Sequence, residues 1–158
     1  MKNEFWLYKK HKDAIEYTDF ESTSFRFRIN SETQFKLDMA ENAYNSLFAW
    51  DRIQPSFNFF YDFPENENRI KELLNSSLLV STKWLYVETL STIPILKVST
   101  RYFIEHWIDF VNANAGQGSY CLSEDKRLLL EFTDDSKYHL FSNFPIHNDL
   151  DVERSQRI

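Results

Sequence analysis

Residues 99–141 read STRYFIEHWIDFVNANAGQGSYCLSEDKRLLLEFTDDSKYHLF and carry the strongest structural signal in the chain. The first part of this stretch repeats apolar residues at helical spacing: Phe103, Ile104, Trp107, Ile108 and Val111. Ser99 or Thr100 is the expected N-cap, and Gly116 fits the left-handed position that follows a last helical turn. We therefore predict a helix that begins near Ser99 and ends in Asn-Ala-Gly at 114–116.

The second part of the stretch predicts a β-hairpin. Residues 128–132 and 138–141 are rich in apolar and aromatic side chains, and the polar residues 133–136 between them are typical of a turn. A helix followed by an antiparallel hairpin favours the α+β class over an alternating α/β arrangement.

Upstream of this stretch, three further elements are predicted. Residues 84–90 are apolar on both alternating faces except at Glu88 and Thr89, as expected of a central strand covered on both sides. In residues 57–63 an aromatic side chain occupies every second position and Pro64 follows, which predicts a strand. Ile70, Leu73 and Leu74 recur at helical spacing and predict a helix over residues 67–76.

The N-terminal third is more ambiguous. Residues 4–17 show apolar residues at helical spacing and predict a helix. Phe25, Phe27 and Ile29 alternate with arginines and predict a strand with one solvent-exposed face. Residues 31–40 allow two interpretations: a helix opened by a capping box at Ser31 and Gln34, or a hairpin loop at 30–33. We favour the hairpin, followed by a short helix over residues 40–50.

The chain is expected to form one domain. Its 158 residues contain no repeat or Pro/Gly/Ser-rich linker, and two glycines leave little material for a hinge. We predict a single α+β domain over residues 1–158, with a mostly antiparallel sheet, several packed helices and a frayed tail after about residue 150.

Composition narrows the class of partner. The net charge of −6 repels nucleic-acid backbones and attracts a basic protein, and the many aromatic residues are of a type enriched at protein interfaces. The single cysteine fits a reducing compartment, and no apolar run is long enough to act as a signal peptide or to span a membrane. These features predict a cytoplasmic protein with no direct nucleic-acid or membrane partner.

No catalytic constellation is evident. The chain has no nucleophile elbow, and strand alternation places Cys121 inside the sheet as an inert thiol. The two glycines, Gly116 and Gly118, follow a helix and precede a strand, which is the wrong context for a phosphate-binding loop. We therefore expect no enzymatic activity and no cofactor.

No metal site is expected either. The four histidines, His11, His106, His139 and His147, show no i,i+4 pairing and have no cysteine partners. His106 is interpreted as a surface residue of the helix, and His139 as a wet or hydrogen-bonded residue of the hairpin. Residues 147–151 lack the central glycine and the distant glutamate of a calcium loop.

Two pairs of carboxylates, Glu124-Asp125 and Asp134-Asp135, lie in expected turns of the C-terminal sheet. Asp in a turn is explained by local capping of backbone amides, and an acidic rim that meets a basic partner is the alternative. The pairs lie together at one end of the sheet or, if strand 128–132 runs straight between them, about 15–17 Å apart.

The segments at 101–115, 118–120, 128–135 and 138–144 resemble bacterial immunity proteins of contact-dependent growth inhibition systems. The resemblance covers about the last third of the chain, and the first hundred residues match no family. It implies a cytoplasmic, non-enzymatic protein that binds and blocks the C-terminal toxin domain of one delivered effector. Such toxins are often nucleases and hence often basic.

With this resemblance, the four carboxylates Glu124, Asp125, Asp134 and Asp135 become candidate toxin-binding residues. The alternative function is a small cytoplasmic enzyme or ligand-binding α+β domain, which would need a pocket where Glu88, Glu131 or a histidine has a shifted pKa.

Overall fold

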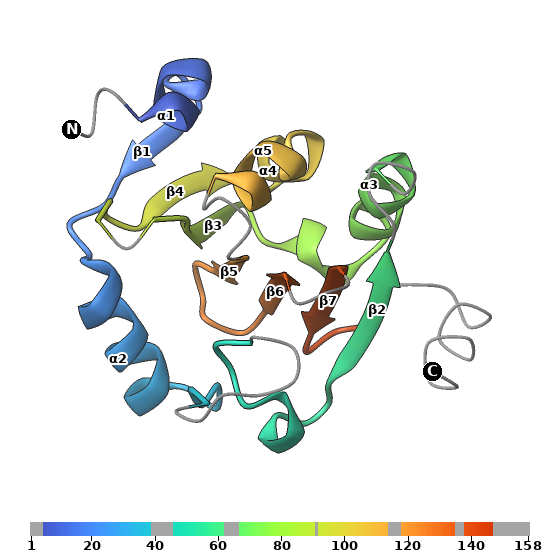
Figure 1. Cartoon of the computed structure of the whole chain (residues 1–158). Helices are drawn as coiled ribbons and strands as arrows, with labels where there is room; N and C mark the ends of the chain where they lie inside the picture. The colour runs from blue at the N-terminus through green and yellow to red at the C-terminus, as the bar shows by residue number, and fades with distance from the viewer. Residues whose placement is uncertain are drawn as a thin grey trace.

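The protein forms an α+β domain around one antiparallel sheet (Figure 1). The structure is a computed structural model that describes residues 5–38, 46–61, 67–90, 92–113, 118–134 and 138–146. The seven strands are β1 (Ile15–Tyr17), β2 (Phe57–Tyr61), β3 (Trp84–Glu88), β4 (Leu96–Ser99), β5 (Ser119–Ser123), β6 (Leu129–Asp134) and β7 (Tyr138–Ser142). Their order across the sheet is β1-β4-β3-β5-β6-β7-β2.

Five α-helices and two 3₁₀ turns surround the sheet in the described part of the chain. The helices are α1 (Trp6–His11), α2 (Ser22–Glu32), α3 (Glu67–Asn75), α4 (Thr100–Glu105) and α5 (Trp107–Asn112). The 3₁₀ turns are η2 (Trp50–Arg52) and η3 (Leu78–Ser81). Figure 1 shows α3, α4 and α5 on one face of the sheet and α2 with the η2 segment on the other.

Strand alternation supplies both faces with apolar side chains. In β6, Leu130 and Phe132 join the core under α3, α4 and α5, whereas Leu129 joins the core under α2 and η2. The central strand β3 divides its residues in the same way, with Leu85 and Val87 in the first core and Tyr86 packed against the second. Because both faces of the sheet are covered, the sequences of its strands are nearly continuous runs of apolar residues.

Four predicted elements are confirmed: the central strand, the strand over residues 57–63, the helix over residues 67–76 and the C-terminal hairpin. Strand β3 lies between β4 and β5, β2 and α3 lie within the predicted ranges, and β6 and β7 pair as an antiparallel hairpin. The turn predicted over residues 133–136 starts too early, because Thr133 and Asp134 still pair with β7 as the last residues of β6. Residues 135–136, Gly116 and the tail after residue 150 lie outside the described residues.

The helix expected from Ser99 onward is present but is divided at His106. The Ser99 hydroxyl caps α4 by accepting a hydrogen bond from the Tyr102 N–H, as predicted. His106 then leaves the helical region, with φ −118° and ψ 26°, and α5 starts at Trp107. Phe103 and Trp107, four residues apart, both pack on Phe132, with ring centroids 6.5 and 5.3 Å away.

The strand predicted over residues 25–29 is wrong, because this segment is the middle of α2. Phe25 and Ile29, four residues apart, are buried, whereas Phe27 is 70% exposed. Only a helix places these three side chains in that way, since a strand would send all three to one face. Five residues of alternation are too few to separate the two periods.

The hairpin loop predicted at residues 30–33 is also wrong, and so is the alternative of a helix opened by a capping box at Ser31. Residues 30–32 form the last turn of α2, and the C-cap residue Thr33 donates its N–H and its hydroxyl to the Ile29 carbonyl. Residues 40–45 of the predicted 40–50 helix lie outside the described residues, and residues 46–49 are not helical. Phe48 instead forms an isolated antiparallel bridge with Leu37.

The helix predicted over residues 4–17 is shorter than expected. It covers Trp6–His11, after which the chain turns and adds β1 to the edge of the sheet beside β4. Ile15 is buried opposite Val98 in this pairing, so a tertiary contact outweighs the local helical period.

Candidate functional site

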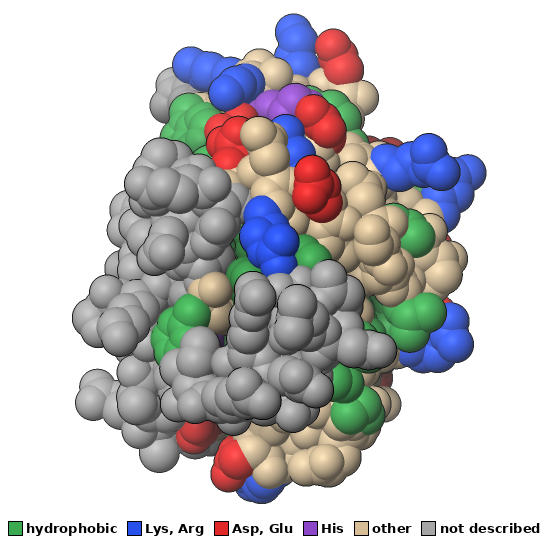
Figure 2. Space-filling view, turned by 90° about the vertical axis from the view of Figure 1, so that its right-hand side faces the viewer, with side chains coloured by type: hydrophobic (Ala, Val, Ile, Leu, Met, Phe, Trp, Pro, Cys, Tyr) green, Lys and Arg blue, Asp and Glu red, His purple; other side chains and the backbone are tan. Residues whose placement is uncertain are grey.

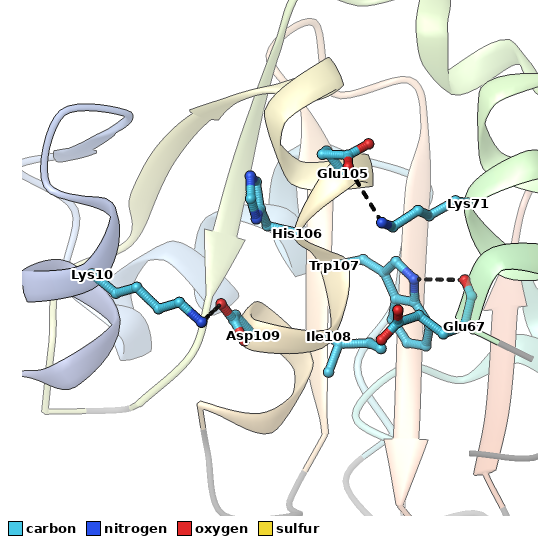
Figure 3. A pocket seen from close by; sticks show the side chains of 8 residues that line it. All are labelled: Lys10, Glu67, Lys71, Glu105, His106, Trp107, Ile108 and Asp109. Carbon is cyan, nitrogen blue, oxygen red and sulfur yellow. Dashed lines mark hydrogen bonds and ion pairs between the residues drawn. The ribbon is translucent and has the colours of Figure 1, made fainter. Parts of the chain in front are cut away.

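An open pocket lies where α1, α3 and the α4–α5 segment meet (Figure 3). It has a volume of about 270 Å³ and is lined by Lys10 of α1, Glu67 and Lys71 of α3, and residues 105–109. Polar and charged side chains form most of this lining, and Figure 3 shows Lys10, His106 and Asp109 on the side toward α1.

His11 is the buried centre of the polar cluster beside this pocket. Its side chain is only 3% exposed, and its Nε2 lies 2.7 Å from Asp109 Oδ2. Its Nδ1 is hydrogen-bonded to the Tyr102 hydroxyl, and its ring stacks on Phe110 at 5.9 Å. Both ring nitrogens are therefore engaged, and the imidazole is held in one orientation.

The other members of the cluster come from one stripe of the α4–α5 segment. Tyr102, His106 and Asp109 recur at i, i+4 and i+7, which places them along one side of the segment. The His106 ring centroid lies 4.9 Å from that of His11 and 4.4 Å from that of Tyr102.

The charges around His11 shift the pKa values of its neighbours. Burial alone would raise the pKa of Asp109, but hydrogen bonds from Lys10 and His11 outweigh burial and lower it. Burial, followed by the neighbouring His11, lowers the pKa of His106, and burial raises that of Tyr102. At neutral pH the cluster thus holds a carboxylate, a neutral His106 imidazole and a protonated phenol.

The structure brings together a set of metal-ligand groups that the sequence pattern did not predict. One ligand atom each from His11, His106 and Asp109 lies within 4.8 Å of the others. The histidine spacing gave no sign of this convergence, and the expectation that the chain has no metal site stays a prediction. The tyrosine–histidine–aspartate stripe in residues 102–109 was the available signal, and His11 arrives from a segment about ninety residues upstream.

The carboxylates Glu124 and Asp125 lie in the turn between β5 and β6, as predicted. Glu124 forms an ion pair with Lys97 at 3.0 Å, and Asp125 forms one with Arg127 at 2.7 Å. Asp125 also accepts a hydrogen bond from the Ser123 hydroxyl at 2.6 Å, which together with Arg127 lowers its pKa. Local turn chemistry and adjacent cations thus account for both side chains, and the field of this turn is smaller than its two acids suggest.

The second acidic pair lies elsewhere. Asp134 is the last residue of β6, so the full length of that strand separates it from the 124–125 turn. Of the two arrangements left open by the sequence, the position of Asp134 agrees with the one in which the strand separates the acidic residues, because a hairpin strand has its two turns at opposite ends. Asp135 and the side chain of Asp134 lie outside the described residues.

Two buried carboxylates, Glu88 and Glu131, lie on the face covered by α2 and η2. Glu88 accepts hydrogen bonds from Ser22, Arg26 and Tyr120. Glu131 accepts hydrogen bonds from Ser46, the Leu47 N–H and Trp50 Nε1. Burial raises the pKa of Glu131 despite these donors.

The donors to these two carboxylates belong to the segments that cover the sheet. The hydrogen bonds to Glu88 therefore connect α2 with β3, and those to Glu131 connect residues 46–50 with β6. Neither carboxylate lines the pocket beside His11.

Cys121 is buried in β5, as the alternation predicted. Burial raises the pKa of its thiol, which keeps it protonated and unreactive. His139, which we expected to be wet or hydrogen-bonded, is 1% exposed and lies inside the sheet between β2 and β6.

Surface charge is mixed over the face shown in Figure 2, where histidine is visible between acidic and basic side chains. Among the described residues, no helix has the length and apolar character needed to cross a membrane. A scan against models of known protein families found no match, and a search of curated proteins found no similar sequence.

Proposed function

We propose that the chain is an immunity protein that binds and neutralises the toxin domain of a delivered effector in the cytoplasm. The observation that carries this proposal is the resemblance of residues 101–144 to immunity proteins of contact-dependent growth inhibition systems. In the fold these residues make up α4, α5 and strands β5–β7, so the resembling segment is one contiguous unit.

The use of the buried carboxylates supports a binding role over a catalytic one. Glu88 and Glu131 were the acids whose environments would suit catalysis, and both are saturated by donors from α2 and residues 46–50. A group whose lone pairs are already occupied by structural donors has little capacity to move a substrate proton.

The proposed contact area is the surface around α2. Phe27 is 70% exposed on this helix, and an exposed aromatic ring is the kind of residue that anchors protein interfaces. The C-terminal end of α2 meets the 124–127 turn through an ion pair of 3.2 Å between Lys126 and Glu32. The proposed toxin-facing surface therefore joins Glu32 to Glu124 and Asp125, and Phe27 is a further exposed residue of the same helix.

The proposal predicts that a toxin domain is encoded next to the gene of this chain, and the test is a binding measurement between that domain and the full chain. We expect a one-to-one complex by analytical ultracentrifugation and protection of toxin-expressing cells from growth arrest. Absence of both the complex and the protection would overturn the proposal.

Variants then locate the contact surface. Phe27→Ala should speed dissociation. The double variant Glu124→Gln/Asp125→Asn should slow association and reduce its salt dependence, because charges at the rim of an interface act mainly on the association rate. Asp134→Asn/Asp135→Asn is made separately, since it changes the opposite end of β6. If all three variants bind like the wild type, the toxin contacts another face.

The second candidate function is a ligand-binding domain or small enzyme. The observation that favours it is the pocket beside His11, where two imidazoles, a carboxylate and a phenol converge. Toxin protection that persists when His106 is changed to Ala would separate this pocket from the proposed binding function.

A further inference from the structure

We propose that His11, His106 and Asp109 bind one divalent transition-metal ion, best matched by Zn²⁺, at the mouth of the pocket between α1 and the α4–α5 segment. The proposal rests on the geometry of these residues and does not depend on the proposed binding of a toxin.

The donor set suits zinc. Imidazole nitrogens and a carboxylate oxygen are ordinary zinc ligands, and three protein ligands with an open fourth position are typical of sites that hold a water or substrate. The three ligand atoms lie within 4.8 Å of one another, whereas atoms bound to one Zn²⁺ at about 2.0–2.2 Å lie roughly 3.3 Å apart. Rotation of the partly exposed His106 ring supplies the remaining approach.

The surroundings of His11 are those of an oriented metal ligand. Metal-bound histidines use their second ring nitrogen to contact a neighbouring group, which fixes the ring and its tautomer. The Tyr102 hydroxyl provides this contact at Nδ1 and leaves Nε2 directed at Asp109, where the ion would lie.

Metal binding at Nε2 requires that this nitrogen carries no proton. Where the metal-free ring has its proton on Nε2, the Nε2–H donates to Asp109 and the Tyr102 O–H donates to Nδ1. With metal, Nε2 supplies its lone pair to the ion and Nδ1–H donates to the tyrosine oxygen, so the ring changes tautomer and releases no net proton.

Lys10 occupies the place of the cation in the present arrangement. Its ammonium lies 2.9 Å from Asp109 Oδ2, and its side chain is 60% exposed, so it can leave the carboxylate for solvent at little cost. Lys10, His106 and Asp109 all line the open pocket, from which a water reaches the fourth coordination position.

The test is titration of the tag-free full chain with ZnCl₂ by calorimetry, with Co²⁺ absorption as a second readout of coordination by nitrogen and oxygen ligands. We expect one equivalent of metal. His106→Ala and Asp109→Asn should each weaken binding by at least about a hundredfold, since even the loss of a residue behind a ligand costs about 10–100-fold. His11 is not substituted first because it is buried.

Three further variants make the test specific. Lys10→Met should tighten binding by up to about fivefold, because it removes a competing cation. Tyr102→Phe should weaken binding by about 10–100-fold, because it removes the group that orients His11. His147→Ala, which changes a histidine outside the described residues, and Asp51→Asn, which removes an exposed carboxylate, should leave binding unchanged.

Absence of stoichiometric binding to the wild type overturns the proposal. So does binding that survives in both His106→Ala and Asp109→Asn, or binding that is lost in His147→Ala. Circular dichroism of each variant shows that the fold is retained before affinities are compared.

Discussion

At the scale of single residues, Trp107 illustrates how one side chain joins two layers. Its ring is 1% exposed and stacks on Phe132 of β6, and its Nε1–H donates to the Glu67 carbonyl of α3 at 3.2 Å. The residue therefore links α5 to the sheet and to a neighbouring helix.

Trp107→Ala should lower the free energy of unfolding by about 3–5 kcal/mol, because it removes a large buried side chain. The matched control is Trp6→Ala, which changes a ring that is 44% exposed and should shift stability by no more than about 0.5 kcal/mol. Urea denaturation of both variants measures the difference. A Trp107→Ala midpoint equal to that of the wild type would contradict the packing described for α5.

Glu131 should give the stability of the protein a specific dependence on pH. Burial raises its pKa in the folded state above the ordinary value of 4.5. A carboxyl with a raised folded pKa binds its proton more tightly when folded, so its contribution is fully present below the unfolded pKa and is lost as the pH rises through the folded pKa.

Relative to Glu131→Gln, the wild type should therefore gain stability as the pH falls from neutrality toward 4.5. Paired urea unfolding curves of the two proteins over this range provide the measurement, and the other titrating groups cancel in the difference. A difference that stays constant with pH would show that the folded pKa of Glu131 is not raised.

At the scale of elements, α2 shows how a buried charge stabilises a helix with little amphipathic character. Arg26 donates to both oxygens of Glu88, at 2.9 and 3.0 Å, and Ser22 donates to the same carboxylate. The hydrogen bonds to Glu88 raise the pKa of Arg26, which stays charged. A charged pair of this kind aligns α2 on β3, while Phe25 and Ile29 provide the apolar contact.

Two substitutions in α2 distinguish the observed helix from the strand that the alternation over residues 25–29 predicts. Phe25→Ala should cost about 3–5 kcal/mol, because its ring packs against Phe20 and Tyr86 at centroid distances of 5.3 and 5.5 Å. Phe27→Ala should change stability by less than about 0.5 kcal/mol. Chemical denaturation reads both values, and equal losses would indicate that both rings face the same side, as in a strand.

At the scale of the whole molecule, the aromatic composition is used mainly for packing. Among the described residues, Trp6 and Phe27 are the exposed large aromatic side chains, while rings such as Phe48, Phe103 and Phe132 are fully buried. A sheet that is covered on both faces has two cores, and large aromatic side chains fill both of them. The aromatic content by itself is therefore weak support for a binding role.

The candidate metal site also belongs to the scale of the whole molecule. Tyr102, His106 and Asp109 form a stripe that can be recognised in the sequence, but His11 approaches it only because β1 pairs with β4 and α1 packs beside α5. The resulting contact between His11 and Asp109 joins residues that are 98 positions apart in the chain. No local sequence pattern encodes such a contact.

The sequence by itself determined the α+β class, the C-terminal helix and hairpin, the central strand β3, and the elements β2 and α3. Each of these has a run of apolar residues long enough to distinguish a period of 3.6 from a period of 2, or a proline or cap that marks its end. The burial of Cys121 followed from the same alternation.

Only the tertiary structure decided the N-terminal third and the candidate site. Residues 25–29 form a helix because Glu88 and the β3–β5 face receive Arg26 and Phe25, and residues 15–17 form a strand because the edge of β4 offers hydrogen bonds. The polar cluster depends on the same docking of α1. In these segments local propensities are nearly balanced, so the free energy of burial and pairing with distant residues selects the conformation.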